Sequence, residues 1–177
     1  WHLYRALETA LDAIPPDRAE HRLVPTALYR TGRIEADLDH LTDRRWRDGD
    51  HLTPATRAYV DRVASNSVFP AGLIAHGWLR YMGNVGGRDT LRRLSAASIG
   101  AADDVQDGLA FTDFAAVGDI RPFFAGFHAK LDSLPLSAGE KRDTVTEAAT
   151  GFHLNIALTD ELARDFRVHA PTQAATA

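Results

Sequence analysis

A helical stretch over residues 71–99 contains more glycine than an ordinary helix tolerates. Apolar residues recur at helical spacing on both sides of four glycines at positions 77, 83, 86 and 87. Each interior glycine costs a helix roughly 1 kcal/mol relative to alanine, so this density needs a structural reason. A bend near residues 84–88, a backbone surface for a flat ligand, or a close crossing of two helices would each supply one.

The rest of the chain also reads as helices, and no segment shows the period-two pattern of a strand. Thr53 with Pro54, and Ser137 with Glu140, are helix-start signals. The expected helical regions are residues 1–14, 28–41 with a break near Gly32, 54–63, 120–134 and 138–166. The pattern predicts an all-α single domain over residues 1–168, followed by a flexible tail over residues 169–177.

Composition excludes several function classes. The 177 residues carry a net charge of −4, which gives no support for nucleic-acid or membrane binding. No cysteine is present, so disulfides, thiolate ligands and cysteine nucleophiles are absent, which fits a reducing compartment. No apolar run approaches the roughly 20 residues that span a bilayer. We expect a cytoplasmic protein.

Metal-binding and catalytic motifs are scarce. Of the eight histidines, only His40 in the spacing Asp37-x-x-His40 comes near a helical carboxylate–histidine metal site, and one such pair is a weak signal. No P-loop, dinucleotide fingerprint or nucleophile elbow occurs.

The glycine-bearing stretch, Ala75-His76-Gly77-Trp78-Leu79-Arg80-Tyr81-Met82-Gly83-Asn84-Val85-Gly86-Gly87-Arg88, resembles the distal helix of the heme oxygenase family. That family reads roughly A-H-x-Y-x-R-Y-L-G-D-L-S-G-G-Q. The segments at residues 1–8, 131–134 and 152–158 are similar to other family helices in the same order. The resemblance covers about the first 165 residues and implies a multi-helix bundle with a glycine-kinked distal helix.

The resemblance also implies an oxidoreductase activity. Heme oxygenases bind heme as substrate and cofactor, and cleave it to biliverdin, carbon monoxide and iron with electrons from an external donor, often a reductase. Their iron is held by a proximal histidine that precedes the position of Trp1. We therefore expect no metal ligand within this chain, a proximal histidine upstream of Trp1, and heme that is not tightly retained.

The same comparison assigns roles to individual residues. The catalytic positions implied are Asn84, at the family's acidic relay position, with Gly83 and Gly87. The heme-contacting positions implied are Tyr4, Tyr81, Gly83, Gly87, Arg88, Phe124, His128, Phe152 and Asn155. His76 matches a family histidine that is not the ligand, and we expect it to be structural and hydrogen-bonded.

Four positions depart from the family pattern. An amide at Asn84 positions water but does not exchange a proton as a carboxylate does. Arg88 replaces a glycine, and a long cation there either enters the pocket or points away from it. Phe124 and His128 replace basic residues that pair with the heme propionates. These departures predict weak or slow activity.

Two other hypotheses stay open at this point. In the first, the chain is a catalytically degenerate relative that binds heme weakly, another tetrapyrrole or a protein partner. Alternatively, it is a helical oligomerisation module in which Gly87 and its neighbours serve a subunit contact.

Overall fold

The computed structural model describes residues 1–49, 52–100 and 107–169. The longer helices are α1 (His2–Asp12), α2 (Thr31–Thr42), α3 (Pro54–Ser65), α4 (Pro70–Gly77), α5 (Gly83–Gly86), α6 (Arg88–Ile99), α7 (Ile120–Asp132) and α8 (Ala138–His169). A π-helical segment, η4 (Trp78–Met82), joins α4 to α5. Short 3₁₀ turns are η1 (Thr26–Leu28), η2 (Arg45–Asp48), η3 (Asn66–Val68), η5 (Ala110–Thr112) and η6 (Ala115–Val117). No strand occurs in the described residues, so the predicted all-α class is confirmed.

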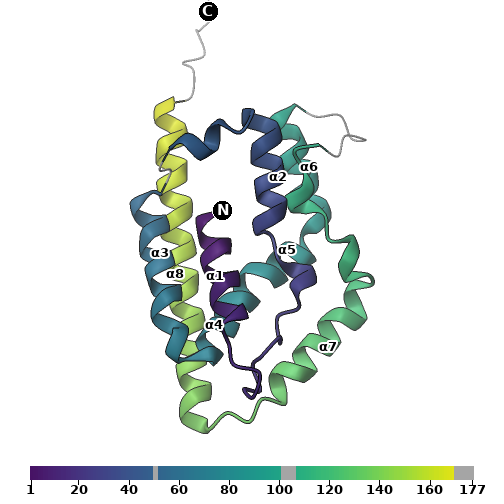
Figure 1. Cartoon of the computed structure of the whole chain (residues 1–177), viewed down its shortest axis with the longest axis vertical. Helices are drawn as coiled ribbons and strands as arrows, with labels where there is room; N and C mark the ends of the chain where they lie inside the picture. Colours follow the sequence, from purple (N-terminus) through teal and green to yellow (C-terminus); the bar gives the residue numbers. More distant parts are fainter. Residues whose placement is uncertain (50–51, 101–106, 170–177) are drawn as a thin grey trace, which may run out of the picture.

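The helices surround a centre made by α1 and α4 (Figure 1). Helices α3 and α8 lie side by side along one side of the molecule, and α2 and α6 occupy the other. Helix α7 follows α6 and returns the chain to the start of α8 (Figure 1). This order brings α8, the last helix, against α4, in the middle of the chain.

Two short helices, α1 and α4, lie at the centre of the core. Helix α1 buries one face through Leu3, Leu7 and Leu11, which recur at helical spacing. Helix α4 is buried on every side, from Ala71 to Gly77, as expected for a helix without a polar face. Since α4 runs directly into η4, the glycine-bearing stretch is anchored at its N-terminal end by the core.

Local capping signals correctly predict the starts of two helices, α3 and α8. The side chain of Thr53 accepts a hydrogen bond from the Thr56 amide and caps α3. Ser137 and Glu140 form the predicted reciprocal cap, with distances of 2.8 Å from the Ser137 amide to Glu140 Oε2 and 3.2 Å from the Glu140 amide to Ser137 Oγ. Both caps depend on residues close in sequence, which explains why spacing predicts them.

The break predicted near Gly32 is misplaced. Gly32 lies inside the first turn of α2, and the interruption falls between η1 and α2. The free amides at the start of α2, those of Arg30 and Thr31, donate to the carboxylate of Glu8 on α1. A carboxylate far away in sequence therefore fixes this helix start, and α2 tolerates the glycine.

At the C-terminal end, α8 continues to His169. The remaining predicted tail, residues 170–177, lies outside the described residues. The division into a domain over residues 1–168 and a flexible tail stays a prediction.

Candidate functional site

The four glycines of the glycine-bearing stretch, the central stretch of the chain over residues 75–88, have different environments. A Cβ at Gly77 would lie 2.8 Å from Val24 Cγ2, so this glycine permits close packing. A Cβ at Gly83 would meet nothing within 4 Å, and one at Gly86 would lie 3.7 Å from Phe124 Cζ. Gly77 therefore serves the core, whereas Gly83 and Gly86 leave accessible backbone on an open face.

Gly87 ends the regular helix. Its φ of −99° and ψ of 12° lie outside the α-helical range, and α6 begins at the next residue. The Gly87 amide still donates to the Gly83 carbonyl at 3.0 Å, and an added Cβ at Gly87 would lie 3.2 Å from that oxygen. The interruption falls within the predicted residues 84–88.

Four polar side chains from four elements meet beside this open backbone. We call Tyr4 of α1, Arg80 of η4, Asn84 of α5 and Asn155 of α8 the donor cluster. Asn84 Nδ2 donates to Tyr4 Oη at 2.7 Å, and Arg80 Nη2 donates to the same oxygen at 3.3 Å. Arg80 Nη1 donates to Asn155 Oδ1 at 2.5 Å. These residues, three of them candidates from the sequence, lie at one place in the fold.

The backbone geometry of η4 helps to explain this meeting. The wider π-helical turn places Arg80 on the side of Tyr4, with its guanidinium carbon 5.0 Å from the centre of the Tyr4 ring. Tyr4 is buried, and Arg80 and Asn84 are half-buried. The cluster is therefore held by packing on one side and open to solvent on the other.

Phe152 is exposed on α8 next to the donor cluster. It lies one helical turn before Asn155, and its side chain is 50% exposed. Ile156, which follows Asn155, is 58% exposed. Large apolar side chains exposed on one helix face mark a surface suited to an apolar ligand or partner.

Tyr81 faces away from the open surface. It is fully buried, and its hydroxyl donates to Glu8 Oε1 at 3.0 Å. Burial, with the nearby Glu8 charge, raises the pKa of Tyr81 far above its ordinary value. Tyr81 thus links η4 to the carboxylate of Glu8, which caps α2. It lies in the core, behind the open backbone where the sequence analysis expected it to contact heme.

The candidates on α7 lie on a separate part of the same region. Phe124 packs near Gly86, and the exposed His128 lies beside it, with ring centroids 6.1 Å apart. Arg88 does not join the donor cluster. It lines a hollow of about 310 Å³ shared with Asp113 and Phe114 of the segment before α7.

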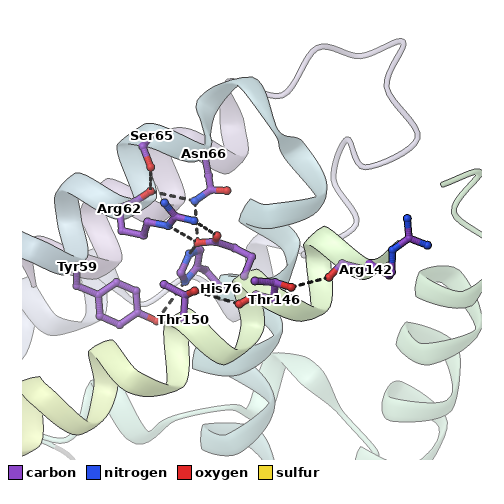
Figure 2. A network of polar contacts seen from close by, with 9 residues as sticks. Tyr59, Arg62, Ser65, Asn66, His76, Arg142, Thr146 and Thr150 are labelled. Atoms are coloured by element: carbon purple, nitrogen blue, oxygen red, sulfur yellow. Dashed lines mark hydrogen bonds and ion pairs between the residues drawn. The ribbon is translucent and has the colours of Figure 1, made fainter. Parts of the chain in front are cut away.

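A second polar cluster, which sequence reasoning did not find, surrounds His76. The ring of His76 is fully buried, with Nε2 2.7 Å from Glu147 Oε1 and Nδ1 3.3 Å from Tyr59 Oη. Glu147 also accepts hydrogen bonds from Arg62 and Asn66. Figure 2 shows Tyr59, Arg62 and Asn66 gathered around His76. We call these five residues the buried cluster.

The protonation states of the buried cluster follow from its contacts. Because Glu147 only accepts as a carboxylate, His76 Nε2 carries a proton and Nδ1 accepts from Tyr59. Burial lowers the pKa of His76, although Glu147 opposes the shift. Burial raises the pKa of Glu147, but donors led by Arg62 outweigh it and the pKa is lowered. His76 is therefore neutral and structural, as expected.

Asp37, the carboxylate of the weak metal-site candidate, caps η5. Its two oxygens accept from the Ala110 and Phe111 amides, each at 2.7 Å. No group of three or more histidine, cysteine, aspartate or glutamate side chains that could hold a metal ion occurs in the described part of the chain. None of its helices has the length and hydropathy to cross a bilayer.

Comparison with known proteins decides how this arrangement is classified. The profile of the family described as heme oxygenase matches residues 1–161. The chain belongs to the heme oxygenase family. Heme oxygenase 1 of Rattus norvegicus is 29% identical over 164 residues, which are 92% of this chain and 56% of the relative. Heme oxygenase of Pyropia yezoensis is 30% identical over 163 residues, 92% of this chain and 68% of the relative.

Solved structures of heme oxygenases have the same fold as this chain. Heme oxygenase-2 of the cyanobacterium Synechocystis, in complex with heme and NO, superposes with a TM-score of 0.86 at 28% identity, covering 96% of this chain and 70% of that one. Heme oxygenase-1 of Synechocystis, in complex with heme, gives a TM-score of 0.83 at 26% identity, with coverages of 93% and 73%. The chain spans little more than half of the rat relative. The predicted family and heme oxygenase-like fold are confirmed.

Proposed function

We propose that this chain forms the distal part of a heme oxygenase, which binds heme and cleaves it to biliverdin, carbon monoxide and iron. The observation that carries the proposal is the open backbone at Gly83 and Gly86 beside the donor cluster. A flat porphyrin needs a surface without side chains, and donors at its edge to organise water.

The residues around the open backbone fit heme as a substrate. Phe152 and Ile156 expose apolar surface on α8, and Leu79 of η4 is only half-buried. Gly83 leaves space where any other residue would project a Cβ. Apolar walls with a few convergent polar groups are typical of a small-molecule site.

The iron ligand is proposed to come from outside residues 1–177, as a histidine upstream of Trp1. Of the histidines near the open face, His128 is exposed on α7 and aligns with a propionate partner of the family. His76 is fully buried and hydrogen-bonded through both ring nitrogens. Neither supports a proximal role.

The donor cluster determines how protons and water are handled. Bound heme supplies the iron at which oxygen is reduced by an external electron donor. Tyr4 and Asn84 hold water above Gly83 through the Tyr4 hydroxyl and the Asn84 amide. Because the amide does not exchange a proton as a carboxylate does, protons reach the site through water or the Tyr4 hydroxyl, and we infer slow turnover.

The residues of α7 explain why we expect heme to be weakly retained. Phe124 offers no charge to a propionate, and the imidazole of His128 lacks the bidentate donor pair of an arginine. Arg88 pairs loosely with Asp89, 3.7 Å away, and faces the hollow near Asp113.

The Asn84→Asp variant tests this mechanism. Hemin is added to the full-length protein, with any residues that precede Trp1, followed by an electron donor. We expect slow formation of a biliverdin spectrum, accelerated about tenfold or more by Asn84→Asp, a barrier change of roughly 1.4 kcal/mol. Thr90→Asp, which adds the same charge at an exposed site on α6, serves as the control. Equal rates in all three proteins would contradict a role for Asn84.

A catalytically degenerate relative is the second candidate, favoured by Asn84 and Phe124 at positions where the family carries charge. It would bind heme weakly, bind another tetrapyrrole, or bind a protein partner. A heme complex that stays unchanged under reduction, in both wild type and Asn84→Asp, would select this alternative.

A further inference from the structure

Arg80 is a half-buried cation whose hydrogen-bond partners are neutral. It donates to the Asn155 amide oxygen and to the Tyr4 hydroxyl. None of the ion pairs found within residues 1–49, 52–100 and 107–169 includes Arg80. The donor cluster therefore has a net positive charge in a partly desolvated position.

The cluster also has more donors than acceptors. Arg80 Nε is buried and has no hydrogen-bond partner. Tyr4 Oη already accepts from Asn84 and Arg80, so its own proton points elsewhere. Buried donors of this kind are normally satisfied, and this N–H has no acceptor within the described residues.

The carboxylate of Glu8 does not supply that acceptor. Its oxygens accept from Tyr81 and from the Arg30 and Thr31 amides at the start of α2. In the buried cluster, by contrast, Glu147 accepts directly from Arg62 and His76. Of the two clusters on these helices, only the donor cluster lacks a carboxylate.

We propose that the donor cluster binds a small monovalent anion, such as chloride, next to Arg80. A guanidinium N–H, a hydroxyl and amide N–H groups that converge without a carboxylate form charge-assisted hydrogen bonds to an anion. The half-buried Asn84 leaves the cluster accessible to solvent. This site requires no heme and goes beyond the proposed function, so it is tested on heme-free protein.

The test replaces gluconate by chloride at constant ionic strength and pH 7. Nitrogen–proton NMR spectra report the side-chain amides of Asn84 and Asn155 and the indole of Trp78, two residues before Arg80. We expect saturable shifts at these groups, with a dissociation constant on the order of 1 mM to 100 mM. Gluconate is a much larger anion and serves as the reference.

Two variants place a carboxylate beside Arg80. Asn84→Asp does so from α5, and Asn155→Asp does so from α8. Each is expected to weaken chloride binding at least about tenfold, because the carboxylate occupies the guanidinium and repels anions. Thr90→Asp adds the same charge on exposed α6 and should bind chloride as wild type does.

Either of two results overturns the proposal. One is the absence of saturable shifts in the wild type. The other is an unchanged chloride affinity in whichever carboxylate variant gives a folded spectrum. Since hemin is absent throughout, failure here leaves the heme proposal intact, and failure of heme binding leaves this site testable.

Discussion

The buried cluster and the donor cluster lie one after the other along the same helices, yet they are built oppositely. Glu147 and Asn155 lie on α8, and each contacts a residue of the central stretch, His76 or Arg80. The buried cluster is centred on a carboxylate, and all its members except the exposed Arg62 are buried, whereas the donor cluster has no carboxylate and is partly open. A satisfied polar network fixes a helix contact, and an unsatisfied one remains available to a ligand.

The contact between the two helices joins these clusters. A Cβ at Gly151, between Glu147 and Asn155 on α8, would lie 2.9 Å from Leu79 Cδ2 and 3.1 Å from His76 Nδ1. Close approach at Gly151 therefore aligns Asn155 with Arg80. The buried cluster supports the geometry of the candidate site without touching it.

The largest expected effect is the loss of folding stability on removing a side chain from the buried cluster, compared with the donor cluster. Glu147→Ala leaves the buried Nε2 donor of His76 without an acceptor and removes one of the two acceptors of the Asn66 amide, and we expect it to lower the free energy of unfolding by about 3 kcal/mol. Asn155→Ala breaks one hydrogen bond in a half-buried place, and we expect a loss of about 1 kcal/mol or less. Urea unfolding followed by circular dichroism measures both. Equal losses would contradict the distinction between the clusters.

A smaller effect, opposite in sign at two glycines, sharpens the comparison. Gly151→Ala adds a Cβ that forces Leu79 and His76 away from α8, and we expect it to destabilise the protein by about 1–2 kcal/mol. Gly83→Ala fills open space on a backbone with φ −60° and ψ −43°, and we expect a gain of about 0.5–1 kcal/mol from helix propensity. Thermal unfolding of the heme-free proteins checks the signs. A loss at Gly83 would show that its backbone is not open.

Acid sensitivity is expected to belong to the buried cluster. The pKa of His76 is lowered in the folded protein, so the unfolded chain binds more protons as the pH falls below about 6.5. The free energy of unfolding should therefore decrease from pH 7 to pH 5. Glu147, whose pKa is also lowered, adds to the loss below about pH 4.5.

The control for acid sensitivity is His76→Gln, which keeps a donor toward Glu147 but does not titrate. We expect a shallower pH dependence between pH 7 and pH 5, measured by urea unfolding at each pH. Parallel curves for wild type and variant would assign the acid sensitivity to other histidines.

Sequence reasoning succeeded where the interacting residues are close along the chain or aligned with a family. The reciprocal cap of Ser137 and Glu140 and the helix end at Ile99 follow from local patterns. Tyr4, Asn84 and Asn155 were found through resemblance, and the structure brings them together around Arg80.

Sequence reasoning failed where a residue far away along the chain determines the local structure. The start of α2 depends on Glu8, and the environment of His76 depends on Glu147, 71 residues away. Periodicity also does not distinguish Gly77, which permits packing against Val24, from Gly83, which faces open space. These differences are fixed by tertiary contacts that a single sequence does not reveal.

A hemin titration of the full-length wild type and its Gly83→Leu variant tests the heme site most directly. We expect a stoichiometric Soret complex in the wild type and a loss of affinity of at least about tenfold in the variant, because the leucine covers the backbone surface that receives the porphyrin. Gly32→Leu, the same change at an open position in α2, should bind hemin as the wild type does. No stoichiometric complex in the wild type, or equal affinity in all three proteins, would contradict a heme site over Gly83.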